Sequence, residues 1–185
     1  MVLGASLFVL IRLSRSSGLS IEQIHFDVQR FGTHTGYQLI ASVQNKQKGI
    51  IYELVPSIKV LGENLQLLRV EQYEENGHAT VECKLEPMRE IGYVWRVIRS
   101  ETERQGSWPE LRGGDRVMLV YPAESTFVGF SESAALYGNK GRFMSTQNFL
   151  HLEQGVTYKI LIEVKGANSN KTTVSVSKTA KQTIS

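Results

Sequence analysis

The stretch Leu152-Glu153-Gln154-Gly155-Val156-Thr157-Tyr158 introduces the most regular part of the chain. It leads into a β-forming run at residues 158–164, a turn-forming segment at 166–170 and a second alternating run at 171–177. Two runs of β-formers joined by a short segment rich in Gly, Asn and Ser are typical of a β-hairpin. The C-terminal end of the chain therefore predicts an antiparallel pair of strands.

Period-two alternation recurs closer to the N-terminus. Residues 24–28 and 37–43 place apolar side chains at every second position, and 64–73 and 79–85 flank a turn that contains Asn76-Gly77. Asn-Gly tolerates the positive φ angles of a tight hairpin turn. No segment sustains helical periodicity, so the sequence predicts an all-β fold, built as an antiparallel β-sandwich.

Three segments interrupt this regular pattern. Pro56 lies within the run at residues 50–60 and predicts an edge strand or a bulge, because proline cannot donate a hydrogen bond to a β-ladder. Residues 99–115 are polar and are expected to form a long loop. Residues 131–147 are rich in Gly, Ser and Asn and are predicted to be the least regular part, with one helical turn near 133–137.

The chain of 185 residues can form one large sandwich or two small ones. We expect an apolar N-terminal segment and linker at residues 1–20, a β-sandwich at 21–122, and a β-rich extension or partial second sandwich at 123–185. The last block contains few strands for a closed core. It is expected either to pack on the first sheet as one extended sandwich or to be completed by a strand from elsewhere.

The N-terminal segment at residues 2–11 is uncharged and apolar on both of its strand faces. It is too short to span a bilayer as a helix, which takes about 20 residues. Three interpretations remain open: the remainder of an anchor with membrane contact, a strand donated to this or a neighbouring subunit, or the first core strand. In the second interpretation, the predicted assembly residues are Leu3, Leu7, Val9 and Ile11.

Charge and cysteine content restrict the classes of partner. The net charge of +3 is small and the lysines are spread along the chain, so no nucleic-acid partner is expected. The single cysteine, Cys83, excludes a disulfide within the chain and a cysteine metal cluster. Cys83 alternates with apolar residues on a predicted strand, and a buried thiol is the favoured interpretation.

No catalytic constellation is recognisable in the sequence. The four histidines lack a close metal-ligand spacing, and His34 in its Gly-framed loop is interpreted as a turn residue. Glu74 and Glu75 lie next to each other in a predicted turn, whereas carboxylates for acid–base catalysis must converge across a cleft. We therefore predict a protein that is not an enzyme and has no cofactor and no catalytic or metal site.

Trp108, beside Pro109 in the predicted loop, is the candidate binding residue. Exposed aromatic side chains can anchor a protein partner or stack on a sugar. The structural alternative is packing beneath a long loop. A glycan or protein ligand at Trp108 is thus one expectation for this chain.

Leu152, Gly155 and Tyr158 resemble the Leu-x-Pro-Gly-x-x-Tyr corner of fibronectin type III domains, with Gln154 at the usual proline position. In that family the tyrosine hydroxyl is bonded to the backbone at the corner. The resemblance implies a fibronectin-like or immunoglobulin-like sandwich, with these three residues as its structural corner.

The block at residues 37–61 is similar to the immunoglobulin-like sandwiches of archaeal and bacterial envelope proteins. Pilin-like and archaellum-associated subunits carry such a domain behind an apolar N-terminal segment. The resemblance implies an extracellular or cell-surface structural subunit that forms homo-oligomers or filaments, and it transfers no catalytic residue. The alternative is an adhesion or ligand-binding module that recognises protein or glycan through its loops.

Overall fold

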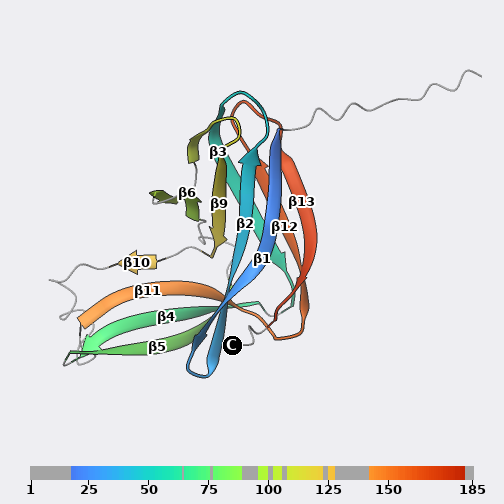
Figure 1. The fold of residues 1–185 in the computed structure, drawn as a ribbon. Helices are drawn as coiled ribbons and strands as arrows, with labels where there is room; N and C mark the ends of the chain where they lie inside the picture. The colour runs from blue at the N-terminus through green and yellow to red at the C-terminus, as the bar shows by residue number, and fades with distance from the viewer. Residues whose placement is uncertain are drawn as a thin grey trace, which may run out of the picture.

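All regular structure in the described part of the chain is β-strand. The computed structural model describes residues 18–63, 65–75, 77–88, 96–99, 102–105, 108–122, 125–127 and 142–181. The strands form two antiparallel sheets (Figure 1). The predicted all-β fold is therefore confirmed, and the two sheets are consistent with a β-sandwich.

The larger sheet contains nine strands. Their bounds are β1 (Leu19–Phe31), β2 (His34–Asn45), β4 (Gln66–Glu75), β5 (His78–Pro87), β6 (Arg96–Arg99), β7 (Thr102–Gln105), β9 (Arg116–Tyr121), β10 (Ser125–Phe127) and β11 (Arg142–His151). The order along the sheet is β5, β4, β11, β2, β9, β6 and β7, while β1 pairs with β2 and β10 pairs with β11. The predicted hairpin at Asn76-Gly77 is confirmed, since Glu75 pairs with His78 across the turn and Gly77 has a φ of +78°.

The smaller sheet contains four strands, in the order β13, β12, β3 and β8. Their bounds are β3 (Ile51–Leu61), β8 (Trp108–Leu111), β12 (Thr157–Lys165) and β13 (Thr172–Thr179). β12 and β13 pair antiparallel from Thr157 opposite Thr179 to Val164 opposite Thr172. The C-terminal hairpin predicted from the sequence is thus confirmed.

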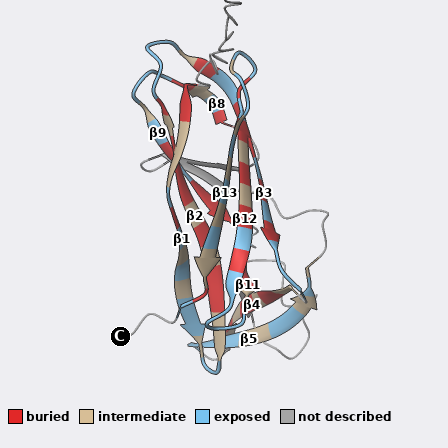
Figure 2. Cartoon of the chain, turned by 90° about the vertical axis from the view of Figure 1, so that its right-hand side faces the viewer, coloured by how far each residue is buried: buried red, intermediate tan, exposed pale blue. Residues whose placement is uncertain are grey.

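The main core lies between the two sheets. Alternate residues of β12 are buried, among them Ile160 and Ile162, while the residues between them are more exposed (Figure 2). Leu39 and Leu119 of the larger sheet belong to the same buried cluster. Each such side chain stabilises the fold by about 1.5–3 kcal/mol through removal from water.

β4, β5 and β11 form a wing of the larger sheet. These strands run across the direction of β1 and β2 and project to one side of the sandwich (Figure 1). β11 meets β2 where Leu150 pairs with Tyr37, and it pairs with β4 along its length. The wing has a small apolar cluster of its own, formed by Leu68, Val70 and Phe149.

Two segments predicted to be irregular contain strands. The expected loop at residues 99–115 includes β7 and β8, and the irregular segment expected at 131–147 includes the start of β11. β8 is four residues long and buries only two side chains, Trp108 and Leu111, so its sequence has no alternating pattern long enough to predict a strand. The helical turn predicted near residues 133–137 lies outside the described residues.

The predicted boundary near residue 122 does not separate two sheets. β11 and β12 follow this position, yet β11 pairs with β2 and β4, and β12 pairs with β3. The strands of the C-terminal block are therefore inserted among those of the first block. Leu19 and Ser20, expected to lie in the linker, are the first residues of β1.

Pro56 lies at a local edge of β3, although β3 as a whole is not an edge strand, because it lies between β12 and β8. β3 pairs with β8 between Ile51 and Leu54, and no described strand lies on that side of Pro56. Glu53 has a φ of +47°, but the pairing of β3 with β8 keeps one register from Ile51 to Leu54, so it contains no bulge. Pro56 therefore lies beyond the stretch that β8 covers and pairs only with β12 among the described strands, opposite Val164.

Candidate functional site

The structure buries the predicted binding residue Trp108. It lies in β8 opposite Leu54, is 6% exposed and belongs to the main core. The expectation that Trp108 is an exposed loop residue is wrong, because pairing of β8 with β3 turns the indole inward. The predicted assembly residues Leu3, Leu7, Val9 and Ile11 lie outside the described residues.

The three corner residues lie together where the chain enters β12. Leu152 and Tyr158 are buried, and Gly155 has a φ of +82°, a backbone conformation that favours glycine. The Tyr158 hydroxyl accepts a hydrogen bond of 2.9 Å from the backbone N–H of Glu153. This bond ties the tyrosine ring to the turn that precedes its own strand.

β5 forms one edge of the larger sheet. It pairs with β4 from Pro87 opposite Gln66 to His78 opposite Glu75, and no other described strand pairs with it. Alternate residues of β5 share a face, and on one face these are Ala79, Val81, Cys83 and Leu85. This face of the edge strand carries no charge.

Two of these side chains are unusually exposed for their type. Val81 is 49% exposed and Leu85 is 41% exposed. Figure 2 shows β5 as one of the most exposed strands of the described chain. Edge strands commonly carry charges or prolines that block pairing with another chain. β5 carries its charges on the opposite face, at Glu82, Lys84 and Glu86, and ends at Pro87.

The tip of the β1–β2 hairpin lies over this apolar face. Phe31 pairs with His34 across a two-residue turn at Gly32-Thr33, and Gly32 has the positive φ of +60° that such a turn requires. The Phe31 ring lies 4.9 Å from the Phe149 ring, centroid to centroid, and like Cys83 it packs against the wing cluster. The hairpin is thereby fixed to the wing.

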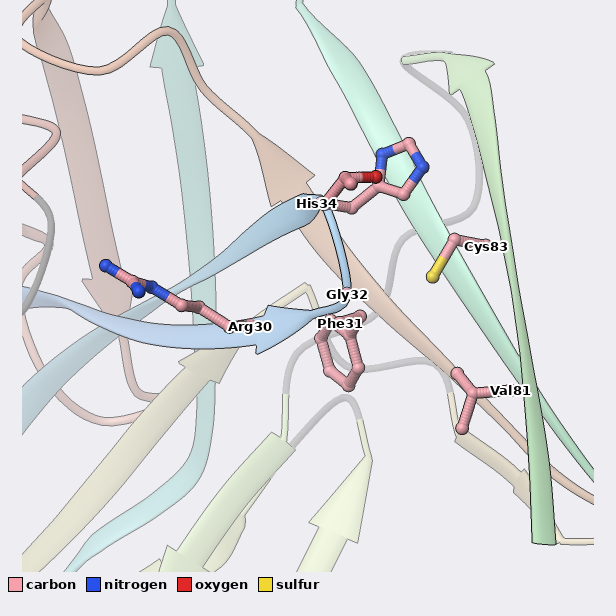
Figure 3. Close-up of a pocket in the computed structure, with 7 residues that line it drawn as sticks. Arg30, Phe31, Gly32, His34, Val81 and Cys83 are labelled. Atoms are coloured by element: carbon pink, nitrogen blue, oxygen red, sulfur yellow. The ribbon is translucent and has the colours of Figure 1, made fainter.

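A cavity of about 490 Å³ opens between the hairpin tip and β5. Its lining residues are Arg30, Phe31, Gly32, Thr33, His34, Val81 and Cys83. In Figure 3 the side chains of Val81 and Cys83 point from β5 toward the tip. The cavity therefore adjoins the open edge of the sheet.

The groups around the cavity do not form a recognisable catalytic or metal site. Burial raises the pKa of the Cys83 thiol, which disfavours the nucleophilic thiolate. The described residues contain no group of three or more His, Cys, Asp or Glu side chains placed to hold a metal ion. The arrangement offers an apolar surface and main-chain pairing, which suit recognition of an extended peptide.

The opposite face of the wing contains a buried charge. Glu71 is 5% exposed and accepts hydrogen bonds of 2.7 Å from the Tyr73 hydroxyl and from Lys84 Nζ. Arg69 Nε lies 2.9 Å from its other carboxylate oxygen. Burial alone would raise the pKa of Glu71, but the bonds from Lys84 and Tyr73 outweigh burial and leave the pKa below its ordinary value.

Glu71→Gln should lower the free energy of unfolding by about 1–2 kcal/mol at neutral pH, because the charged acceptor of two hydrogen bonds and the ion pair with Arg69 are lost. A lowered pKa means that the carboxylate stabilises the fold above the ordinary glutamate pKa of about 4.3 and loses this effect as the pH falls through the folded value. The difference between wild type and variant should therefore shrink below about pH 4. Urea unfolding from pH 7 to pH 3 measures it.

Glu63→Gln, in the exposed turn after β3, is the matched control and should follow the wild-type curve at every pH. A constant difference between wild type and Glu71→Gln across this range would contradict the assignment of the effect to the ionised carboxylate.

The sequence predicts the strand β5 but not its position at an accessible edge of the sheet. The alternation of Ala79, Val81, Cys83 and Leu85 predicts a strand with a buried face, and burial is complete for none of the four. Only the pairing order, which leaves β5 at an edge, distinguishes a core strand from an accessible one. The position of the hairpin tip over β5 has no local signal in the sequence.

Comparison with known proteins adds no family to these observations. The described part of the chain contains no helix that is both long and apolar enough to cross a membrane. No protein-family model matches the chain, and no curated protein sequence matches it significantly.

Proposed function

We propose that this protein is a non-catalytic structural subunit that assembles with copies of itself by β-strand addition. The observation that carries the proposal is the edge strand β5, whose uncharged face leaves Val81 and Leu85 exposed. Strand addition gains main-chain hydrogen bonds along the edge and buries alternate apolar side chains. The uncharged segment at residues 2–11 has the composition of a strand that is added in this way.

We also propose that the sandwich is fibronectin-like or immunoglobulin-like and that the subunit lies outside the cytoplasm. The bond between Tyr158 and Glu153 supports a fibronectin-like or immunoglobulin-like sandwich, because that family uses a tyrosine at this corner. Such sandwiches, placed behind an apolar N-terminal segment, are suited to a surface filament or envelope assembly outside the cytoplasm. The chain's single cysteine means that no disulfide within this chain stabilises its fold.

Deletion of residues 1–13 should abolish assembly and leave a folded monomer, because β1 begins only at Leu19. Sedimentation velocity of the full chain and the truncated chain measures the assembly state, and far-ultraviolet circular dichroism checks that the β-structure is kept. A second variant keeps the chain length and places aspartate at Leu3, Leu7 and Val9. It should behave like the truncated chain.

The matched control carries Ser14→Asp, Ser16→Asp and Ser17→Asp, which add the same charge outside residues 2–11. It should assemble as the wild type does. Normal assembly of the truncated chain would rule out residues 2–11 as the donated strand.

A further inference from the structure

We propose that the outer edge of β5 and the cavity beneath the β1–β2 hairpin tip form the acceptor site for residues 2–11 of a second copy of this chain. This inference rests on the proposed function and names its binding site. The site consists of a main-chain edge, an apolar side-chain face and a cavity that continues this face.

The main-chain edge has the right length. β5 contains ten residues, His78–Pro87, and residues 2–11 are also ten. Its inner side is occupied by β4, while its outer side faces no other described strand. An added strand would lie about 4.8 Å from β5 and extend the wing by one strand.

One side-chain face of the donated strand matches β5 in polarity. Residues directly opposite each other in a sheet place their side chains on the same face. On β5 the uncharged face contains Val81, Cys83 and Leu85, and the other face contains Glu82 and Lys84. The donated strand would place Leu3, Leu7, Val9 and Ile11 on the uncharged side, where they cover the exposed parts of Val81 and Leu85.

The cavity gives this apolar contact a defined position. Its volume of about 490 Å³ lies between Phe31 and His34 of the hairpin tip and Val81 and Cys83 of β5 (Figure 3). A strand added to β5 carries its face residues past this opening. One aliphatic side chain of the donated strand enters the cavity and contacts Phe31.

Chain length excludes donation within one molecule. β1 contains 13 residues and spans about 40 Å at ~3.3 Å per residue. Its end, Phe31, packs at the wing, and its start lies at the far end of the sandwich (Figure 1). Residues 12–17, which link Ile11 to Gly18, span about 25 Å at most, at ~3.6 Å per residue. The segment can therefore lie along β5 only when it comes from another copy.

Cysteine cross-linking tests the acceptor site directly, because Cys83 is the only cysteine of the chain. Leu3→Cys, Leu7→Cys, Val9→Cys and Ile11→Cys are made singly and oxidised with diamide at concentrations where the wild type assembles. At least one of these variants should give a ladder of disulfide-linked oligomers on a non-reducing gel. Each disulfide would join the introduced cysteine of one copy to Cys83 of the next.

Matched controls occupy the other face of the donated strand. Ser6→Cys and Phe8→Cys would point away from Cys83 and should give at least tenfold less ladder. Adding Cys83→Ser to a ladder-forming variant should remove the ladder. A cross-linked monomer, or equal ladders from both faces, would overturn the proposed site.

Substitution at the acceptor provides a second, independent measurement. Val81→Asp places a charge on the apolar face and should raise the concentration needed for half-assembly at least tenfold. Val55→Asp alters an equally exposed valine of β3 in the other sheet and should leave this concentration unchanged.

The outcomes separate the two proposals. If the wild type assembles but Val81→Asp has no effect and no ladder forms, the acceptor site is overturned while self-assembly stands. If the wild type remains monomeric in sedimentation at all concentrations, the proposed function fails, and the acceptor site fails with it.

Discussion

Replacing Phe149 with alanine should lower the free energy of unfolding by about 3–5 kcal/mol, the range for truncation of a buried phenylalanine. The ring is 1% exposed and forms the wing cluster with Leu68 and Val70. It also contacts Phe31, so its loss leaves a cavity and frees the hairpin tip from the wing. Urea unfolding, followed by circular dichroism, measures the change.

Whether packing of the Phe149 ring causes this loss of stability can be tested at Gly36, over which the ring packs. A Cβ atom at Gly36 would lie 2.7 Å from Cβ and Cγ of Phe149, closer than packed carbon atoms approach. Gly36→Ala should therefore destabilise the wild type. Phe149→Ala removes the ring atoms Cγ and Cδ1 but keeps Cβ, so it relieves part of this overlap, and the two effects should be less than additive. Strict additivity would contradict the contact.

Replacing Asn45 with alanine should cost about 3 kcal/mol, at about 1 kcal/mol for each of three lost hydrogen bonds. Asn45 is fully buried at the end of β2. Its Nδ2 donates to the carbonyl oxygens of Gly49 and Leu111, each at 2.8 Å, and its Oδ1 accepts from the backbone N–H of Gln47 at 2.9 Å. Chemical denaturation of the variant measures the loss.

The neighbouring residue Gln44 is the control for this substitution. Its side-chain bonds to Gly114 and Arg116 are longer, at 3.3 and 3.4 Å, and they lie at the exposed surface. Gln44→Ala should change the free energy of unfolding by less than about 0.5 kcal/mol. Equal losses for the two substitutions would show that Asn45 does not organise the turn between β2 and β3.

Strands with local signals could be predicted from the sequence. The turn at Gly77 and the alternation along β12 are each contained within about ten residues, and both hairpins were identified. β11 could not be predicted, because polar residues such as Thr146 and Asn148 are buried within it. Their burial depends on neighbours that lie far away along the chain.

At the candidate site, too, the burial of side chains could not be predicted from the local sequence. Trp108 was interpreted as exposed because its neighbours are polar, yet pairing of β8 with β3 buries it. Cys83 was expected to be buried because it alternates with apolar residues, yet it is only half-buried, because β5 lies at the sheet edge. In both cases the exposure of the side chain is set by strand order, which no local pattern contains.

The narrow junction between the wing and the sandwich has a consequence for local stability. Their main chains meet where Leu150 pairs with Tyr37, and the wing's own fully buried cluster has three members. With so little apolar surface to lose, the wing should open as a separate cooperative unit, at a lower free energy than the main core. A ligand that binds only the closed form holds such a unit shut by mass action. Rigidity of the wing would then increase with subunit concentration.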